Sequence, residues 1–330
     1  MKSQINSSKH QGETQALTAL AVVLHEPEHL SIRELELTTP GDNEVVVEVE
    51  WSGISTGTER LLWSGNMPPF PGMGYPLVPG YESVGRVAEV GRDCDVKIGT
   101  RVFVSGASCF GEVRGLFGGA ASRLVVAESK VTAISDAIDQ QGILLALAAT
   151  AVHAIDSQND LSPPDLIIGH GVLGRLLARV SIAKGNPAPV VWEIDAKRAL
   201  GAEGYSTLHP DDDERRDYKS VYEVSGAQSA LNSVMPHLAK NGAIVLAGFY
   251  SEPVTFNFPP AFMREAQIRI AAEWQPADLA EATRLVNSGR LSLDGLITHS
   301  AAASDAPSAY RTAFSEPDCL KMILDWRDVS

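Results

Sequence analysis

Short runs of alternating apolar and polar residues dominate the chain from residue 17 to about residue 140. Four of them are LTALAVVL at 17–24, LSIRELEL at 30–37, EVVVEVEWSG at 44–53 and VGRVAEVG at 84–91. Proline- and glycine-rich segments separate these runs. A period of two over four to eight residues is typical of strands with one buried face. The pattern therefore predicts a β-rich unit in this half of the chain.

From about residue 140 onward, longer apolar segments alternate with short, fully apolar runs. ILLALAATAVHAID at 143–156 and GRLLARVSIAKG at 174–185 have helical periodicity, whereas DLIIGHG at 165–171 and PVVWEID at 189–195 are typical of buried strands. Strand, helix and strand are expected again at SVYEVSG, QSALNSVMPHLAK and AIVLAGFY, with later helices at 277–289 and near 305–315. This alternation predicts βαβ units around a parallel sheet, and hence an α/β protein.

A glycine motif lies between one of these strands and the helix that follows it. Gly169, Gly171 and Gly174 form G-x-G-x-x-G directly after an apolar run. In that context the glycines permit a tight turn and close approach of a pyrophosphate to the helix N-terminus. A glycine-rich turn without a ligand is the alternative. The motif predicts a dinucleotide site that includes Gly169, His170, Gly171, Val172, Leu173 and Gly174.

An acidic residue follows the next predicted strand at the expected spacing. Glu193 lies 24 residues after Gly169, close to the roughly 20 at which a carboxylate binds the ribose hydroxyls of NAD. Asp195 is a competing candidate, and Lys197 and Arg198 could accept the 2′-phosphate of NADP. We expect NAD, because the carboxylate of Glu193 would repel that phosphate. Later strand ends add three expected cofactor contacts, Ser225, Gly248 and Phe249.

Composition narrows the class of protein. The 330 residues carry a net charge of −14, with 44% apolar and 21% charged residues, which favours a globular protein and argues against nucleic-acid binding. The three cysteines are far apart, so we expect neither a disulfide framework nor a Cys-x-x-Cys metal site. Residues 1–16 are polar and are expected to be a disordered tail. The apolar run at 143–155 is too short to span a bilayer, and the expected location is the cytoplasm.

Five segments, taken in their order along the chain, resemble the medium-chain dehydrogenase/reductase superfamily. They are VVVEVEWSGISTGTE, LVPGYESVGRVAEVG, IIGHGVLGRLLARV, VYEVSG and AIVLAGFY. The resemblance implies a GroES-like catalytic domain at 17–145 and 286–330 and a Rossmann domain at 146–285. It also implies a homodimer. In zinc-dependent members a cysteine stands in the loop matching Ser55 and Thr56, and a His-Glu pair stands where this chain has Tyr81-Glu82. Hydroxyl groups are poor zinc ligands at neutral pH, so we expect no metal.

A closer resemblance is to the bacteriochlorophyllide a dehydrogenases within that superfamily. It is carried by residues 52–83 together with GLFGGAASRLV, FPPAFMREAQIRIAAEWQPADL and CLKMILDW. This resemblance implies oxidation of a hydroxyethyl group on a bacteriochlorophyllide-type tetrapyrrole to acetyl. A quinone or enone reductase and a pigment carrier without catalysis are the alternatives.

Under this interpretation the segment SGISTGTE supplies a hydroxyl relay. Ser55, Thr56 and Thr58 would pass the proton of the alcohol, with Tyr81 as a further donor and Glu59 or Glu82 as the acceptor. Alternatively, both carboxylates pair with nearby arginines such as Arg60 or Arg86, and the hydroxyl residues form turns.

Apolar and aromatic residues on proline- and glycine-shaped loops are suited to cover a flat ring system. The expected substrate contacts are Met67, Phe70, Met73, Tyr75 and Phe117, with FNFPPAFM at 256–263 from the second domain. Packing within the loops themselves would explain the same residues.

Overall fold

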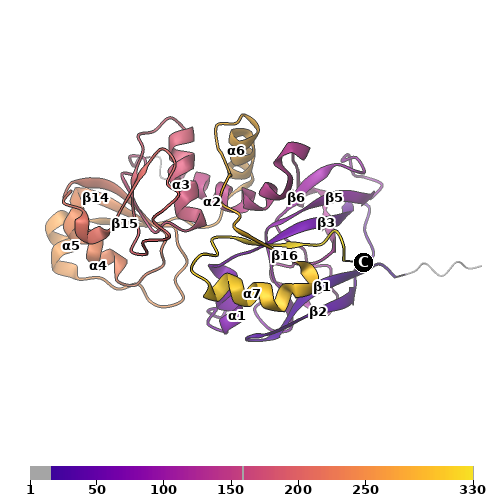
Figure 1. The fold of residues 1–330 in the computed structure, drawn as a ribbon. Helices are drawn as coiled ribbons and strands as arrows, with labels where there is room; N and C mark the ends of the chain where they lie inside the picture. Colours follow the sequence, from indigo (N-terminus) through magenta and orange to yellow (C-terminus); the bar gives the residue numbers. More distant parts are fainter. Residues whose placement is uncertain (1–15, 158–159, 330) are drawn as a thin grey trace, which may run out of the picture.

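The computed structural model describes residues 16–157 and 160–329, so the predicted tail lies outside the described residues except for residue 16. Three sheets form two parts (Figure 1). The N-terminal part holds two β-sheets, and the central part of the chain holds a parallel sheet with helices. Helices α2 and α6 lie where the two parts meet in this view. The architecture is that of a GroES-like unit joined to a Rossmann unit.

The largest sheet is built around the alternating segment at 44–53. Its strands in spatial order are β16 (His299–Ala302), β17 (Met322–Asp325), β3 (Glu44–Ile54), β5 (Ser83–Val90), β6 (Arg101–Val104) and β9 (Val131–Ala133), and β8 (Arg123–Ala127) also pairs with β3. A four-stranded sheet has the order β2 (His29–Glu36), β1 (Thr18–Glu26), β4 (Leu77–Val78) and β7 (Arg114–Gly115). The end of the chain thus returns to the N-terminal part.

The parallel sheet has the strand order of a dinucleotide-binding fold. Across the sheet lie β12 (Ser206–Leu208), β11 (Val190–Trp192), β10 (Leu166–Ile168), β13 (Tyr218–Glu223), β14 (Leu238–Leu246) and β15 (Gln267–Ile270). In chain order this is 3-2-1-4-5-6, with the switch point between β10 and β13. The carboxyl ends of β10, β11, β13 and β14 therefore meet at one edge.

The described residues also form seven α-helices. They are α1 (Thr58–Ser64), α2 (Leu145–Asp156), α3 (Val172–Ala183), α4 (Ala230–Val234), α5 (Phe258–Arg264), α6 (Pro276–Asn287) and α7 (Ala306–Ser315). Together with the 3₁₀ turn before it, α2 forms a helical segment at Asp136–Asp156. By length and composition alone this segment could cross a membrane, but 61% of its most apolar window is buried in the protein. The prediction of a buried helix here is confirmed.

The predicted helix at 228–240 is present but shorter than predicted. Only Ala230–Val234 is α-helical, a 3₁₀ turn follows, and β14 begins at Leu238. Pro236 prevents continuation of an α-helix because it lacks an N–H and its ring clashes with the preceding turn. The apolar residues after it belong to the strand.

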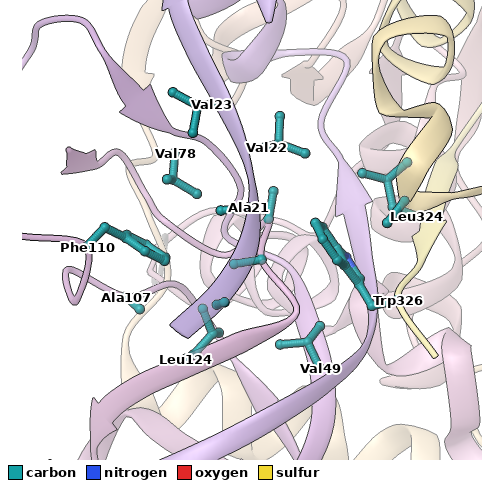
Figure 2. Packing of buried hydrophobic residues seen from close by; sticks show 14 of the residues in the cluster. Ala21, Val22, Val23, Val49, Val78, Ala107, Phe110, Leu124, Leu324 and Trp326 are labelled. Atoms are coloured by element: carbon teal, nitrogen blue, oxygen red, sulfur yellow. The ribbon is translucent and has the colours of Figure 1, made fainter. Parts of the chain in front are cut away.

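The core of the N-terminal part includes both ends of the described chain. Figure 2 shows Ala21 and Val22 of β1 in one cluster with Val49 of β3 and with Leu324 and Trp326 near the C-terminus. Because β17 pairs with β3, residues separated by more than 250 positions meet there. This return of the chain brings Tyr310 of α7 and Lys321, the residue before β17, into the site described next.

Candidate active site

The glycine turn after β10 has the geometry of a pyrophosphate site. Gly169 has φ +105°, and a Cβ on Gly174 would lie 1.9 Å from the carbonyl oxygen of Gly169. Turn and helix α3 therefore pack too closely for any side chain at Gly174. A Cβ on Gly171, the N-cap of α3, would meet nothing within 4 Å. Open space beside the N-terminus of a twelve-residue helix fits an anionic group.

Glu193 follows β11 and binds to the glycine turn. Its carboxylate accepts hydrogen bonds from the backbone N–H of His170 at 3.0 Å and from its own loop at Ile194 and Asp195. The competing Asp195 instead caps the next turn by accepting from the N–H groups of Lys197 and Arg198. Of the two acids, Glu193 thus contacts the glycine turn, whereas these bonds of Asp195 stay within its own loop.

The side chain of His170 does not face the ligand side of the turn. It is fully buried and hydrogen-bonds the carbonyl of Arg198 at 2.6 Å and the hydroxyl of Tyr205 at 2.7 Å. Burial lowers the pKa of His170 to about 4, so the imidazole is neutral at physiological pH. The predicted cofactor contact of His170 is thus limited to its backbone.

The other expected cofactor residues gather at the same edge. Ser225 is exposed beyond β13, and its N lies 3.0 Å from the Cβ position of Gly169. Gly248 and Phe249 follow β14, and Phe249 is 54% exposed. The fully buried carboxylate of Glu223 holds this region by accepting from the N–H of Ser225 at 2.7 Å and from the hydroxyl of Tyr250. The residues that we predicted from separate strand ends therefore form one surface.

Ser55 and Tyr81 form a hydroxyl pair in the N-terminal part. Ser55 Oγ lies 2.5 Å from Tyr81 Oη, and either atom can donate the hydrogen bond. Burial raises the pKa of Tyr81, and the neighbouring charge of Glu82 adds to that effect, so the phenol stays protonated. Tyr81 packs against the cluster that joins the N-terminal part to the parallel-sheet part. Thr58, the first residue of α1, interacts with the Tyr81 side chain, and Thr56 is half-buried in the same loop.

Glu59 is buried directly beneath this pair. Its Oε1 accepts from the backbone N–H of Ser55 at 3.1 Å, and its Oε2 accepts from the hydroxyl of Tyr310 in α7 at 2.9 Å. Burial, with a smaller contribution from the charge of Glu82, raises the pKa of Glu59 to about 8. Glu59 is consequently mostly protonated at neutral pH.

Glu82 forms a buried ion pair with Lys321, the residue before β17. Both side chains are at most 1% exposed, and Lys321 Nζ donates to Glu82 Oε2. Burial raises the pKa of Glu82, and the charge and hydrogen bond of Lys321 oppose that rise. Glu82 Oε1 is buried without a hydrogen-bond partner. The alternative in which arginines neutralise these acids is wrong for Arg86, which pairs with Glu50 and Asp136.

These side chains do not fit a zinc ion. The positions that the resemblance matches to the cysteine and histidine ligands of zinc-dependent relatives hold the hydroxyl loop of Ser55 and Thr56 and the protonated phenol of Tyr81. Ser55 and Tyr81 bond to each other, and hydroxyl groups are poor zinc ligands at neutral pH. Between residues 16 and 157 and between 160 and 329, no three His, Cys, Asp or Glu side chains are grouped to hold a metal ion.

The expected substrate residues differ in their accessibility. Phe117 is 38% exposed and meets the Tyr81 ring edge to face, with centroids 5.5 Å apart. Phe70 is also exposed, and Met73 is half-buried. Met67 instead belongs to the hydrophobic core, and the half-buried Tyr75 donates its hydroxyl to the carbonyl of Leu62 at 2.5 Å. Phe117, Phe70 and Met73 are thus available for contact, whereas Met67 serves packing.

The segment at 256–263 does not join this group. It forms α5 and the residues before it, packs on β14, and lies at the end of the parallel-sheet part farthest from α1 (Figure 1). Our expectation that this segment contacts the substrate together with Phe70 and Phe117 of the same chain is therefore wrong. Its side chains Phe258, Phe262 and Met263 instead form an exposed hydrophobic surface at the edge of the parallel sheet.

Comparisons with known proteins agree with this geometry. Residues 41–136 match the model of the alcohol dehydrogenase GroES-like domain. The chain is 55% identical, over 93% of its length and 98% of theirs, to proteins named 2-desacetyl-2-hydroxyethyl bacteriochlorophyllide A dehydrogenase from Cereibacter sphaeroides and Rhodobacter capsulatus.

Solved structures show the same fold at low identity. A short chain alcohol dehydrogenase from E. coli CFT073 complexed with NADH has a TM-score of 0.78 at 20% identity, with 93% of this chain and 99% of that chain covered. A putative zinc-binding dehydrogenase from Sinorhizobium meliloti 1021 bound to NADP has a TM-score of 0.78 at 21% identity, with 94% and 99% covered.

Proposed function

The chain belongs to the family of the 2-desacetyl-2-hydroxyethyl bacteriochlorophyllide A dehydrogenases, and from this membership we propose that it oxidises the hydroxyethyl group of such a tetrapyrrole to acetyl. It is a dehydrogenase of the medium-chain type that uses a nicotinamide cofactor. The observation that carries the proposal is the 55% identity to these dehydrogenases over 93% of the chain. The hydrogen-bonded hydroxyls of Ser55 and Tyr81, which the family resemblance aligns with the metal-binding positions of zinc-dependent relatives, support a reaction without a metal.

The residues of this chain supply three functions in the reaction. When bound, the oxidised nicotinamide accepts the hydride that leaves the carbinol carbon. Gly169 to Gly174 and Glu193 hold the dinucleotide against the sheet edge. Phe117 and Phe70 cover the ring system, and Tyr81 and Ser55 bind the carbinol oxygen and release its proton toward a buried carboxylate.

The substrate itself reduces the need for a metal. A carbinol carbon attached to a conjugated macrocycle can delocalise positive charge into the ring as hydride leaves, so a full alkoxide need not form first. Zinc would otherwise stabilise that alkoxide. Under this proposal, geometry and a path for the proton are sufficient.

We propose NAD as the coenzyme. The carboxylate of Glu193 lies where a 2′-phosphate would have to bind, and the two cations that could offset it are engaged elsewhere. Lys197 pairs with Asp318, and Arg198 donates to the carbonyl of Pro317. The substitution Glu193→Ser should weaken NAD binding and reduce the difference in affinity between NAD and NADP, as measured by calorimetric titration of both coenzymes.

The proposed assembly is a cytoplasmic homodimer. Strand β15 is the edge of the parallel sheet, and Ile268 and Ile270 on it are exposed, with Ile270 at 77%. Phe258, Phe262 and Met263 of α5 expose further apolar area nearby. An exposed apolar edge strand invites pairing with a second copy.

One assay separates this function from its alternatives. Purified protein is incubated with NAD and the hydroxyethyl bacteriochlorophyllide, and the absorption spectrum of the pigment is followed. A dehydrogenase produces the red-shifted acetyl pigment together with NADH. A carrier binds the pigment without changing it, and an enone or quinone reductase consumes NADPH with an activated alkene and leaves the carbinol intact.

A further inference from the structure

Two buried carboxylates, those of Glu59 and Glu82, act electrostatically on Tyr81, and their hydrogen bonds distinguish them. Both oxygens of Glu59 already accept a hydrogen bond, one from Ser55 N–H and one from Tyr310. In Glu82, Oε2 accepts from Lys321, whereas Oε1 is buried and has no partner. Of these four oxygens, Glu82 Oε1 is the one with a vacant acceptor position. A buried acceptor without a partner is uncommon and requires an explanation.

The surroundings of Glu82 keep its carboxylate next to the site. The backbone N–H of Gly53, two residues before Ser55, donates to the Glu82 carbonyl at 2.8 Å. A Cβ on Gly53 would lie 2.3 Å from Glu82 Oε2 and 3.1 Å from Lys321 Cε. The absence of a side chain at Gly53 thus leaves room for the ion pair directly behind the loop that carries Ser55.

We infer that Glu82 is the acceptor of the alcohol proton and that Lys321 is a positioning residue that keeps Glu82 ionised until the proton arrives. The inference rests on the proposed function. In the step, the hydroxyl pair turns toward Glu82 Oε1, to which neither hydroxyl bonds in the structure, and the O–H proton of the carbinol passes through Tyr81 and Ser55 to that oxygen. The hydride of the same carbon leaves for the oxidised nicotinamide as the C=O bond forms. Glu82 becomes neutral when it takes the proton, so Lys321 is left as an unpaired cation. The nicotinamide becomes neutral in the same step, so the net charge of the site does not change.

The charges that face Glu82 support this assignment. Lys321 is the cation that acts on Glu82. The charge of Glu82 in turn raises the pKa of Glu59, Tyr81 and Tyr310. Since burial raises the pKa of Glu59 to about 8, Glu59 holds its own proton at neutral pH and cannot take a second. The two acids therefore have different roles.

The test is the pH profile of kcat/KM for alcohol oxidation in variants of this pair. Lys321→Met should raise the pH at half-maximal activity on the acid side by about 1–3 units, the range by which an adjacent cation lowers a carboxyl pKa. Lys321→Arg should keep the acid side near its wild-type position. Glu82→Gln should lower kcat about 100-fold or more. The matched control, Glu59→Gln, should leave the acid side of the profile unmoved.

Folding and the proposed function are checked separately. NAD titration and thermal melting identify variants that do not fold. If Lys321→Met does not fold, the double variant Glu82→Gln/Lys321→Met removes the buried charge that Lys321→Met alone leaves unpaired. The double variant should have the low kcat of Glu82→Gln. The carboxylic-acid C=O band in infrared spectra, assigned as the band lost in Glu82→Gln, gives the titration midpoint of Glu82 without any substrate.

The outcomes are distinguishable. An unshifted infrared midpoint in Lys321→Met, or an equal loss of activity at every pH, overturns the inference while leaving the dehydrogenase intact. Full turnover in Glu82→Gln overturns it as well. A wild-type protein that does not oxidise the tetrapyrrole at all overturns the proposed function, and the acceptor role of Glu82 falls with it.

Discussion

At the scale of single residues, the proposed site depends on the hydrogen-bonded hydroxyls of Ser55 and Tyr81. Ser55 was recognisable from the sequence because its loop has a fixed place in the chain order. Lys321 and Tyr310 were not, because they lie 239 and 251 positions from their partners Glu82 and Glu59. Such pairs arise from the pairing of β17 with β3 and carry no local sequence pattern.

The hydroxyl relay predicts a defined loss on substitution. Tyr81→Phe keeps the ring contact with Phe117 but removes the hydroxyl, so turnover should fall about 100-fold while NAD affinity is unchanged. Thr56→Val is the companion variant, with a smaller expected loss. Steady-state kinetics measure both, and wild-type rates in both variants would eliminate the relay.

Glu59 predicts a loss of stability at alkaline pH. Its pKa is raised to about 8 in the folded protein from 4.5 in a free carboxyl, so the folded state holds a proton that the unfolded state releases. The resulting stabilisation is complete below about pH 4.5 and is lost as pH rises toward 8, at about 1.4 kcal/mol per pKa unit. Denaturant unfolding from pH 6 to 9 should show this decline, and Glu59→Gln should flatten it. An equally steep decline in that variant would assign the effect to other groups.

At the scale of elements, the sequence predicted the strands and helices whose pattern is local. The glycine turn could be identified because close packing forces small residues at fixed spacing. The helix expected at 228–240 is shorter than predicted because Pro236 ends it and the following residues enter β14. Strands of two or three residues, such as β4 and β7, are too short to show a period.

Two glycines of the turn make a matched pair for testing the dinucleotide site. Gly174→Ala places a Cβ 1.9 Å from the Gly169 oxygen, so it should cost about 1–3 kcal/mol of stability and weaken NAD binding. Gly171→Ala meets no protein atom and has φ −73°, so it should fold normally and still weaken NAD binding, because its methyl group occupies the space for the pyrophosphate. Thermal melting and calorimetry separate the two effects. Unchanged NAD affinity in Gly171→Ala would move the pyrophosphate away from the turn.

At the scale of the whole molecule, chain order and βαβ alternation were sufficient to predict two units with a parallel sheet in the second. The sequence could not place the apolar segment at 256–263, because exposed and buried apolar residues have the same composition. The structure puts it at the free edge of the sheet beside β15.

That edge predicts the oligomeric state. Ile270→Lys adds a charge to the exposed edge strand and should convert the dimer to a monomer in sedimentation velocity. Ile98→Lys, at a site that is 65% exposed in the loop before β6, is the control and should leave the dimer intact. A wild-type monomer, or a dimer that survives the Ile270 substitution, would contradict pairing through β15.

The central claim is direct hydride transfer from the carbinol carbon of the tetrapyrrole to the nicotinamide. The most direct measurement uses substrate deuterated at that carbon, with mass spectrometry of the reduced coenzyme and the pigment after one turnover. We predict one deuterium in the NADH and an acetyl pigment that has lost it. Unlabelled NADH, or deuterium retained in the pigment, would contradict the account.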